Sequence, residues 1–433
     1  MTHDVTAGPP PAGAAASPAK TDAVVRAQYE AMPYPPRDPA EEAKRLLVGT
    51  PSHLPEVNHY LYAGRRDFRQ PFRALVAGGG TGDACIMLAQ QLHDLKCPAE
   101  VVYLDISTTS RAIAEARAEA RRLRNIRFLT GSLLELPSLG LGLFDYIDCS
   151  GVLHHLKDPQ EGFDTLAAAL APEAGMGVML YGEYGRSGVY PMQDMLRTLA
   201  PVGTDHAARI AMAKRLIRFL PPTNLFRRNT FLNDHLSGND GALYDLLLHS
   251  QDRAYTVPQI ADMTRRAGLR LVSFIEPIRY EPSTYMSDPQ IGRDLAALPY
   301  LERAAFAERL ASNLTTHIFY ATKAGYDTVA RPEDTSAIPV LREMDPAELA
   351  QGLKPGTPLV ANLEGFPWRA QMPPLAGQIV AQIDGRKSIA EIYTSMAMRG
   401  GLPVWDEFHQ QFEQLYVVLN GINHLLLRFR LGE

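Results

Sequence analysis

The sequence predicts an α/β fold in which a seven-stranded, doubly wound sheet carries a helical insertion and is followed by a smaller, mainly helical C-terminal domain. Two observations lead to this fold class. Between residues 73 and 325, short apolar runs of strand type alternate with stretches of helical periodicity, and glycine-bearing loops join them. This alternation is typical of a parallel sheet with helices on both faces. The length of 433 residues exceeds a typical single domain of about 100–200 residues, which predicts a second folded unit.

The segment before the sheet is expected to have two parts. Residues 1–20 are rich in Ala, Pro and Gly, which predicts a disordered tail. Residues 21–72 are interpreted as a helical lid segment, with a helix at 22–31 followed by the stiff, proline-rich run from Met32 to Arg37. Tyr29 and Tyr34 in this segment are candidates to fold over a bound ligand, and plain surface packing is the alternative.

The first sheet elements follow in order along residues 73–182. Each expected strand is an apolar or β-branched run, and each expected helix has an apolar face of helical period. The expected strands are 72–77, 100–104, 126–129, 144–149 and 175–181, and the expected helices are 83–95, 107–124 and 163–170.

Residues 185–255 interrupt this alternation, because they are mostly helical in pattern and contain no clear strand. We interpret them as an insertion that covers the carboxyl edge of the sheet. The pattern then resumes with a helix at 256–267, a strand at 269–275, a helical stretch at 293–312 and a final strand at 317–322. We expect this last strand to be antiparallel and the sheet domain to end near residue 325.

The remaining chain is expected to form a linker and a second domain. Residues 326–357 are loop-rich and contain four prolines, which predicts the linker. Residues 358–433 are the predicted C-terminal accessory domain, with helical periodicity at 379–383, 388–396 and 408–427. A helix, a turn at Asp384-Gly385 and a second helix suggest a winged-helix-like unit.

The most informative motif is a glycine-rich turn between the first strand and the first helix of the sheet. It reads Gly78-x-Gly80-x-Gly82, and Asp83 follows at the start of the helix. Such a turn lets backbone approach a ligand closely, and the helix N-terminus directs free N–H groups at it. Asp105, at the end of the next strand, is well placed to bind a ribose; capping the following helix is the alternative. The motif therefore indicates a nucleoside-containing cofactor.

Four segments, in order, resemble class I (Rossmann-like) S-adenosylmethionine-dependent methyltransferases. They are Val76 to Gly82, Asp105 with Ile106, Thr130 to Leu133, and Phe144 to His155. The resemblance implies S-adenosylmethionine (SAM) as cofactor and S-adenosylhomocysteine (SAH) as product, and it makes 73–325 the SAM-binding domain. It implies cofactor contacts from Ala77, Gly78, Gly79, Gly80, Gly82, Asp83, Asp105, Ile106, Ser132, Leu133, Cys149 and Ser150.

The chain departs from the family at two positions. Val76 stands where many members have an acidic residue near the methionine amine, so Asp83 or a backbone carbonyl is expected to substitute. Ser132 stands where members often have an aspartate for the adenine, which implies a weaker contact or one from the backbone. These departures keep open a non-catalytic SAM-binding scaffold or sensor. An NAD-dependent oxidoreductase is a further alternative, which the glycine spacing disfavours.

Methyl transfer needs a nucleophile about 3 Å from the methyl group and, for hydroxyl or ammonium acceptors, a base. Of the two histidines after the fourth strand, we expect His154 rather than His155 to face the site. Glu183 and Tyr184 follow the fifth strand, at the edge where parallel sheets bind ligands, and Tyr34 is the candidate from the lid. A structural role is the alternative for each. The polar residues of 244–257 are a further candidate lining, or else a solvated helix end.

Composition limits the partners of the chain. A net charge of −5 argues against a general nucleic-acid binder, and no apolar run reaches the roughly 18 residues of a membrane span. There is no signal-peptide pattern, and the three cysteines lack metal-ligand spacing. We therefore expect a cytoplasmic enzyme without a metal, and a homodimer is left open.

The C-terminal region faintly resembles the regulatory domain of some bacterial protein lysine methyltransferases, over the stretch Ile379 to Ile392. The resemblance implies methyl transfer to nitrogen or oxygen, first of all on a protein or peptide side chain. A small biosynthetic metabolite is the alternative acceptor. We expect removal of residues 340–433 to leave cofactor binding intact and to impair turnover.

Overall fold

The computed structural model describes residues 18–398 and 404–430, so most of the predicted tail lies outside the described residues. Its centre is a seven-stranded sheet in the order β3-β2-β1-β4-β5-β7-β6, and β7 runs antiparallel to both of its neighbours. The predicted doubly wound, Rossmann-like sheet with an antiparallel last strand is confirmed. The strands are β1 (Phe72–Ala77), β2 (Ala99–Asp105), β3 (Ile126–Thr130), β4 (Phe144–Ser150), β5 (Leu170–Tyr181), β6 (Arg270–Ile275) and β7 (Thr316–Thr322).

Helices cover both faces of the sheet. Successive residues of each strand point to opposite sides, and both sides of the strands are apolar, so each face needs a covering layer. Ala74 and Val76 of β1 pack in a core with α3 (Leu54–Leu61), α4 (Asp83–Asp94) and α5 (Thr108–Ala120). Leu75 and Ala77 pack on the other face, with α6 (Pro159–Ala169), α11 (Val257–Arg266) and α13 (Tyr300–Ala311). The short helix α2 (Pro39–Glu42) packs against α5, and α12 (Pro289–Ala296) contacts the 3₁₀ helix at Pro282–Thr284.

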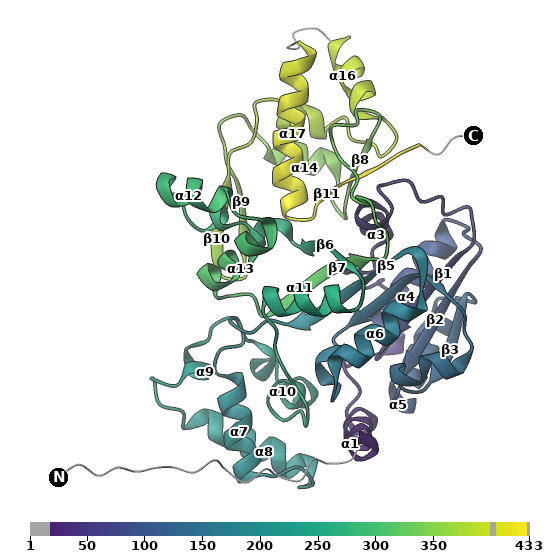
Figure 1. The fold of residues 1–433 in the computed structure, drawn as a ribbon, viewed down its shortest axis with the longest axis vertical. Coiled ribbons are helices and arrows are strands. Elements are labelled where there is room, and N and C mark those ends of the chain that lie inside the picture. Colours follow the sequence, from purple (N-terminus) through teal and green to yellow (C-terminus); the bar gives the residue numbers. More distant parts are fainter. Residues whose placement is uncertain (1–17, 399–403, 431–433) are drawn as a thin grey trace, which may run out of the picture.

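The insertion at 185–255 is helical, as its pattern indicated. Its helices are α7 (Val189–Leu199), α8 (His206–Arg218), α9 (Leu225–Arg228) and α10 (Asp240–Leu247), and they enclose a small apolar core of their own. Figure 1 shows these helices as a group beside the N-terminal helix α1 (Pro18–Ala31), away from the C-terminal unit. Met32, just beyond α1, packs against the insertion core.

The C-terminal unit begins earlier than the sequence suggested. Residues 326–357 do not behave as a linker, because β8 (Ile338–Leu341) pairs with β11 (Leu425–Arg428) and α14 (Pro346–Gly352) packs in the C-terminal core. The expected helix at 408–427 is also too long, since α17 (Trp405–Gly421) ends before β11. The remaining elements are β9 (Leu359–Leu363), β10 (Phe366–Ala370), α15 (Ala376–Val380) and α16 (Ile389–Ala397). Among the helices that the structure describes, none is long and apolar enough to cross a membrane.

The C-terminal unit is built onto the sheet domain through α3. Leu426 of β11 belongs to the core that α3 forms with β1, and the backbone N–H of Leu427 donates to His59 Nδ1 at 3.0 Å. Arg342, just after β8, forms an ion pair of 2.7 Å with the buried carboxylate of Glu56. Removal of 340–433 would therefore expose part of the core that α3 forms with β1, and the expectation that cofactor binding survives this removal stays a prediction.

Candidate functional site

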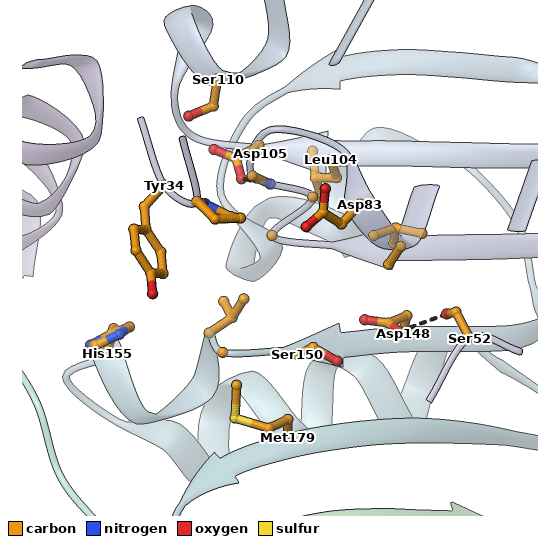
Figure 2. Close-up of a pocket in the computed structure, with 18 of the residues that line it drawn as sticks. Tyr34, Ser52, Asp83, Leu104, Asp105, Ser110, Asp148, Ser150, His155 and Met179 are labelled. Carbon is orange, nitrogen blue, oxygen red and sulfur yellow. Dashed lines mark hydrogen bonds between the residues drawn. The ribbon is translucent and has the colours of Figure 1, made fainter. Parts of the chain in front are cut away.

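A cavity of about 540 Å³ lies at the carboxyl ends of β1, β2 and β4. A volume of this size is typical of a site for a small molecule or cofactor. It is lined by parts of the chain far apart in sequence, among them Tyr34 and Ser52 from before the sheet (Figure 2) and Asp245 from the insertion. The predicted residues that line it are Tyr34, Gly78, Gly79, Gly80, Asp83, Asp105, Ile106, Ser132, Leu133 and Ser150.

The glycine turn is shaped to hold a ligand against backbone. Gly80 has φ of +50°, and a Cβ there would lie 2.9 Å from the carbonyl oxygen of Tyr34. A Cβ on Gly78 would lie 2.2 Å from the side chain of Val152 across the cavity floor. Neither position therefore has room for a side chain unless these neighbours, both of which line the cavity, are displaced. The turn thus fits the close approach of a nucleoside cofactor.

Asp105 ends β2 beside this turn. Its two carboxylate oxygens accept backbone N–H groups of Gly80 and Ser107, each at 2.8 Å. Burial raises the pKa of Asp105, although these hydrogen bonds oppose the shift. Ser107, not Asp105, provides the side-chain cap of α5. Because a carboxylate has about four acceptor positions, Asp105 retains capacity for the hydroxyls of a ribose.

Ser132 has a structural task as well as a place in the cavity wall. Its hydroxyl accepts the backbone N–H of Leu134, and its own N–H donates to Glu135 Oε2 at 2.9 Å, which is a capping box for the 3₁₀ helix η1 (Leu133–Leu139). The hydroxyl proton remains available to a ligand, while the acidic contact that family members often provide is absent.

Three of the predicted cofactor residues are not part of the cavity lining. Ala77, Gly82 and Cys149 do not line the cavity, whereas their neighbours Gly78, Asp83 and Ser150 do. Strand alternation explains Ala77 and Cys149, whose side chains point into the opposite core. A Cβ on Gly82 would lie 2.9 Å from Ala114 of α5, so this glycine serves helix packing.

The histidine that faces the cavity is His155, and the expectation for His154 is wrong in this respect. His154 is fully buried and stacks on the ring of Tyr181 at 3.9 Å, whereas His155 lines the cavity. Both belong to the 3₁₀ helix η2 (Leu153–His155), in which successive side chains point in different directions. Figure 2 shows His155 opposite Tyr34 at one end of the cavity.

Glu183 and Tyr184, both predicted to be catalytic, lie outside the cavity lining. Glu183 is exposed, and the hydroxyl of Tyr184 accepts a hydrogen bond from Arg309 Nε at 3.3 Å. Directly after β5, the backbone of Gly182 forms a β-bridge with Tyr255. The sequence did not reveal this pairing, which directs the chain at 183–184 away from the cavity.

The N-terminal segment lines the cavity beside the glycine turn, through Tyr34, Pro35 and Arg37. Thr81 Oγ1 donates to the carbonyl of Pro35 at 2.6 Å, which holds the proline run against the glycine turn. Arg37 forms an ion pair of 2.5 Å with Asp83, and Arg117 forms another of 2.6 Å. Although burial alone would raise the pKa of Asp83, these two guanidinium groups hold it below its usual value. The carboxylate of Asp83 is therefore already neutralised by the protein.

A buried polar cluster forms the end of the cavity near His155. The hydroxyls of Tyr29 and Tyr181 donate to the two carboxylate oxygens of Asp245, at 3.2 Å and 2.9 Å. His249 contacts the Tyr29 hydroxyl at 3.4 Å and stacks on His155 with ring centroids 3.7 Å apart. The sequence singled out 244–257 as a polar stretch, but not Asp245, because only the fold brings α10 against α1 and β5.

The tautomers of this cluster argue against a metal ion. Ligand atoms of His155, Asp245 and His249 lie within 4.8 Å of one another. However, His249 Nδ1 accepts the backbone N–H of Gln251 at 3.1 Å, and burial lowers the pKa of His249, so the neutral ring carries its proton on Nε2. A metal-bound imidazole nitrogen has no proton. His155 is the reverse case, because Nδ1 lies 2.8 Å from the carbonyl of Gln251 and must donate, which leaves a lone pair on Nε2.

Comparison with known proteins agrees with this geometry. The family profile described as "Methyltransferase domain" matches residues 75–176, which span β1 to β5 and contain the glycine turn, Asp105 and His155. The chain carries a class I SAM-dependent methyltransferase domain. SAM is its cofactor, and the domain is that of an enzyme.

Relatives of this methyltransferase chain differ in what is known of them. An uncharacterized protein from Synechococcus is 29% identical over 310 residues, which cover 71% of this chain and 73% of that protein. The tRNA 5-carboxymethoxyuridine methyltransferase of Escherichia coli is 29% identical over 117 residues, 27% of this chain and 42% of that enzyme. The structure of PKMT2 from Rickettsia typhi has a TM-score of 0.62 at 14% identity, and the match covers 87% of this chain and 75% of that one. A second structure of PKMT2 contains AdoHcy.

Proposed function

We propose that this methyltransferase acts on an amine, which binds as an ammonium ion beside Asp245. The observation that carries this proposal is the charge of the cavity end. Asp245 lines the cavity and is 6% exposed, yet within the described chain no lysine, arginine or histidine forms an ion pair with it. A buried carboxylate is stable only with a counterion or several hydrogen bonds. Tyr29 and Tyr181 supply two hydrogen bonds, so an acceptor ammonium is the group that completes the site.

The tyrosine rings support the same acceptor. Tyr29 and Tyr34 line this end of the cavity, and aromatic faces attract cations. Tyr181 contributes its hydroxyl and not a ring face, because His154 and Arg186 already stack on its ring at 3.9 Å and 3.7 Å. The rings and Asp245 together favour a primary or secondary amine over a neutral hydroxyl.

His155 supplies the base that an ammonium acceptor needs. Its Nε2 lone pair faces the cavity, because Nδ1 is held by the carbonyl of Gln251. The bound ammonium gives one proton to His155 Nε2, and the freed lone pair on nitrogen becomes the nucleophile. Bound SAM supplies a methyl group on a positively charged sulfur, whose leaving group is neutral SAH. The N–C bond forms as the C–S bond breaks, the product leaves as a methylated ammonium, and His155 returns its proton to solvent.

We place the amine on a protein or peptide side chain. The C-terminal unit contributes no residue to the described cavity lining, so its surface is available for contacts with a larger acceptor. The likeness to PKMT2 covers 87% of the chain and so extends beyond the sheet domain. A tRNA acceptor, as named for the Escherichia coli relative, is disfavoured because the net charge of −5 opposes phosphate binding.

Methyl-labelled SAM tests this proposal with matched probes. We expect label transfer to a lysine-containing peptide library and to benzylamine, but not to benzyl alcohol of the same shape. His155→Ala should abolish transfer with SAH binding retained, while His154→Gln serves as the control with the neighbouring histidine changed. Transfer to benzyl alcohol in preference to benzylamine would show that Asp245 does not select for charge. Transfer to benzylamine but to no peptide would favour a small-molecule amine.

A further inference from the structure

The glycine turn of this chain leaves the amino group of the cofactor without its usual partner. By resemblance, an acidic side chain is expected at position 76, where this chain has Val76. The nearby Asp83 is not a replacement, because Arg37 and Arg117 contact both of its oxygens at 2.5–3.1 Å. A further positive charge there would meet two guanidinium groups rather than a free carboxylate.

We propose that Asp148 of β4 provides the carboxylate that binds the amino group of the methionine part of SAM. Strand β4 lies parallel to β1, and Asp148 is the direct register partner of Val76. Tyr146, two residues before Asp148, packs in the same core as Val76, so alternation puts the Asp148 and Val76 side chains on one face. Both residues line the cavity. Compared with an acid at position 76, the carboxylate of Asp148 is on the neighbouring strand, about 4.8 Å away.

Asp148 is a buried carboxylate with few polar partners. It is 1% exposed, and its one hydrogen bond from another segment comes from Ser52 Oγ at 2.6 Å (Figure 2). In the parts of the chain that the structure describes, Asp148 has no ion pair. Burial raises its pKa to about 6, although hydrogen bonds with Ser52 and Ser150 oppose the shift. At neutral pH the cavity wall therefore holds a buried negative charge that an ammonium group would match.

The position of Asp148 suits the methionine end of the cofactor. Figure 2 shows Asp148 and Ser52 on the β4 side of the cavity, apart from Asp105, which is placed for the ribose. The glycine turn joins the two positions, because Gly80 donates its N–H to Asp105 and Val76, just before the turn, pairs with Asp148, so a ligand that contacts both carboxylates passes the turn. This inference concerns the cofactor and does not depend on the identity of the methyl acceptor.

Calorimetric binding of SAH and of an SAH analogue that lacks the α-amino group tests the assignment without any turnover. We expect the unmodified protein to prefer SAH by roughly 10- to 100-fold at pH 8, as for one hydrogen bond to a charged group. Asp148→Asn should bind the two ligands within about threefold of each other. Asp83→Asn, in the same cavity, is the matched control and should keep the preference. The variant Val76→Asp/Asp148→Asn should restore it, because the two positions are neighbours.

A measurement on the unmodified protein covers the case in which Asp148→Asn does not fold. The preference for SAH should shrink as the pH falls through about 6, where Asp148 takes up a proton. The hydrogen bonds to Asp148 come from Ser52 and Ser150, which do not titrate in this range. The titratable groups that interact with it are Cys85, Tyr146 and Cys149, and burial raises the pKa of all three, so they stay neutral there. Equal binding of both ligands by the unmodified protein at pH 8, or a preference that survives in Asp148→Asn and is lost in Asp83→Asn, would overturn the proposal.

Discussion

The ion pair between Arg342 and Glu56 connects the C-terminal unit to the wall of the cofactor cavity, and its removal has a predictable effect on stability. Arg342 Nη1 lies 2.7 Å from Glu56 and 2.9 Å from the hydroxyl of Thr50, which lines the cavity. The Glu56 side chain is fully buried and that of Arg342 is 16% exposed. Tyr320 also donates a hydrogen bond to Glu56, at 3.1 Å. The variant Arg342→Met removes the cation while keeping much of the side-chain volume.

The magnitude follows from the burial of the pair. Removing one partner of a buried ion pair costs about 3–5 kcal/mol, and the partial exposure of Arg342 places this case near about 3 kcal/mol. Burial already raises the pKa of Glu56 against the lowering effect of Arg342, and without Arg342 the pKa rises further. A raised carboxyl pKa makes the native state less stable above that pKa. The loss in Arg342→Met should therefore be largest at alkaline pH and should shrink as the pH falls.

Urea unfolding followed by fluorescence at pH 8 and pH 5.5 measures this loss. The double variant Glu56→Gln/Arg342→Met removes both charges and should recover at least half of the free energy lost in the single variant. SAH affinity should fall in Arg342→Met, because Thr50, which lines the cavity, loses one of its hydrogen-bond partners. A loss below about 1 kcal/mol at pH 8, or a double variant no more stable than the single one, would refute the reasoning.

Four further predictions concern the cavity. Gly80→Arg should abolish SAH binding in calorimetry without unfolding the chain, because even a Cβ there lies 2.9 Å from the Tyr34 carbonyl; normal binding would exclude the turn as the cofactor site. His155→Ala should lower kcat by roughly 10²–10⁴, as for a lost general base, with SAH affinity nearly unchanged. Asp245→Asn should raise KM for an amine acceptor by about 10- to 100-fold, and an unchanged KM would remove its role in charge recognition. SAH affinity should decrease as the pH falls through about 6, since burial raises the pKa of Asp148 to that value and only its ionised form attracts an ammonium group; a flat profile from pH 5 to 8 would contradict this.

Local periodicity was sufficient to predict the sheet domain. Strand β1 was expected at its observed bounds, and most other elements of the sheet domain differ by one to five residues at their ends. The antiparallel direction of β7 was also expected, although alternation of strands and helices by itself favours parallel pairing. The C-terminal unit was harder, because β8 and β11 pair over a long sequence separation and each is four residues long. The segment around β8 is a short strand among loops, and its composition resembles that of a linker. Strand β11 begins soon after α17, so its apolar residues looked like a continuation of the helix.

Some residues of the candidate site could also be predicted from local sequence, whereas others could not. Gly80 and Asp105 were placed correctly in the lining because their roles come from a local turn and a strand end. His155, Asp148 and Asp245 required the fold, since strand register and the packing of the insertion decide which side chain faces the cavity. For Asp148 a signal was present in the sequence: an aspartate in the middle of a mostly apolar strand, beside a strand that lacks its expected acid.

A crystal structure of the protein with SAH bound tests the central claim most directly, namely that this cavity places the methyl group of SAM at the His155–Asp245 end. We predict that the ribose hydroxyls bind Asp105, the amino group binds Asp148, and the sulfur atom is directed toward the side chains of His155 and Asp245. A sulfur atom directed away from this end, or SAH bound at another site, would contradict the proposed arrangement of cofactor and acceptor.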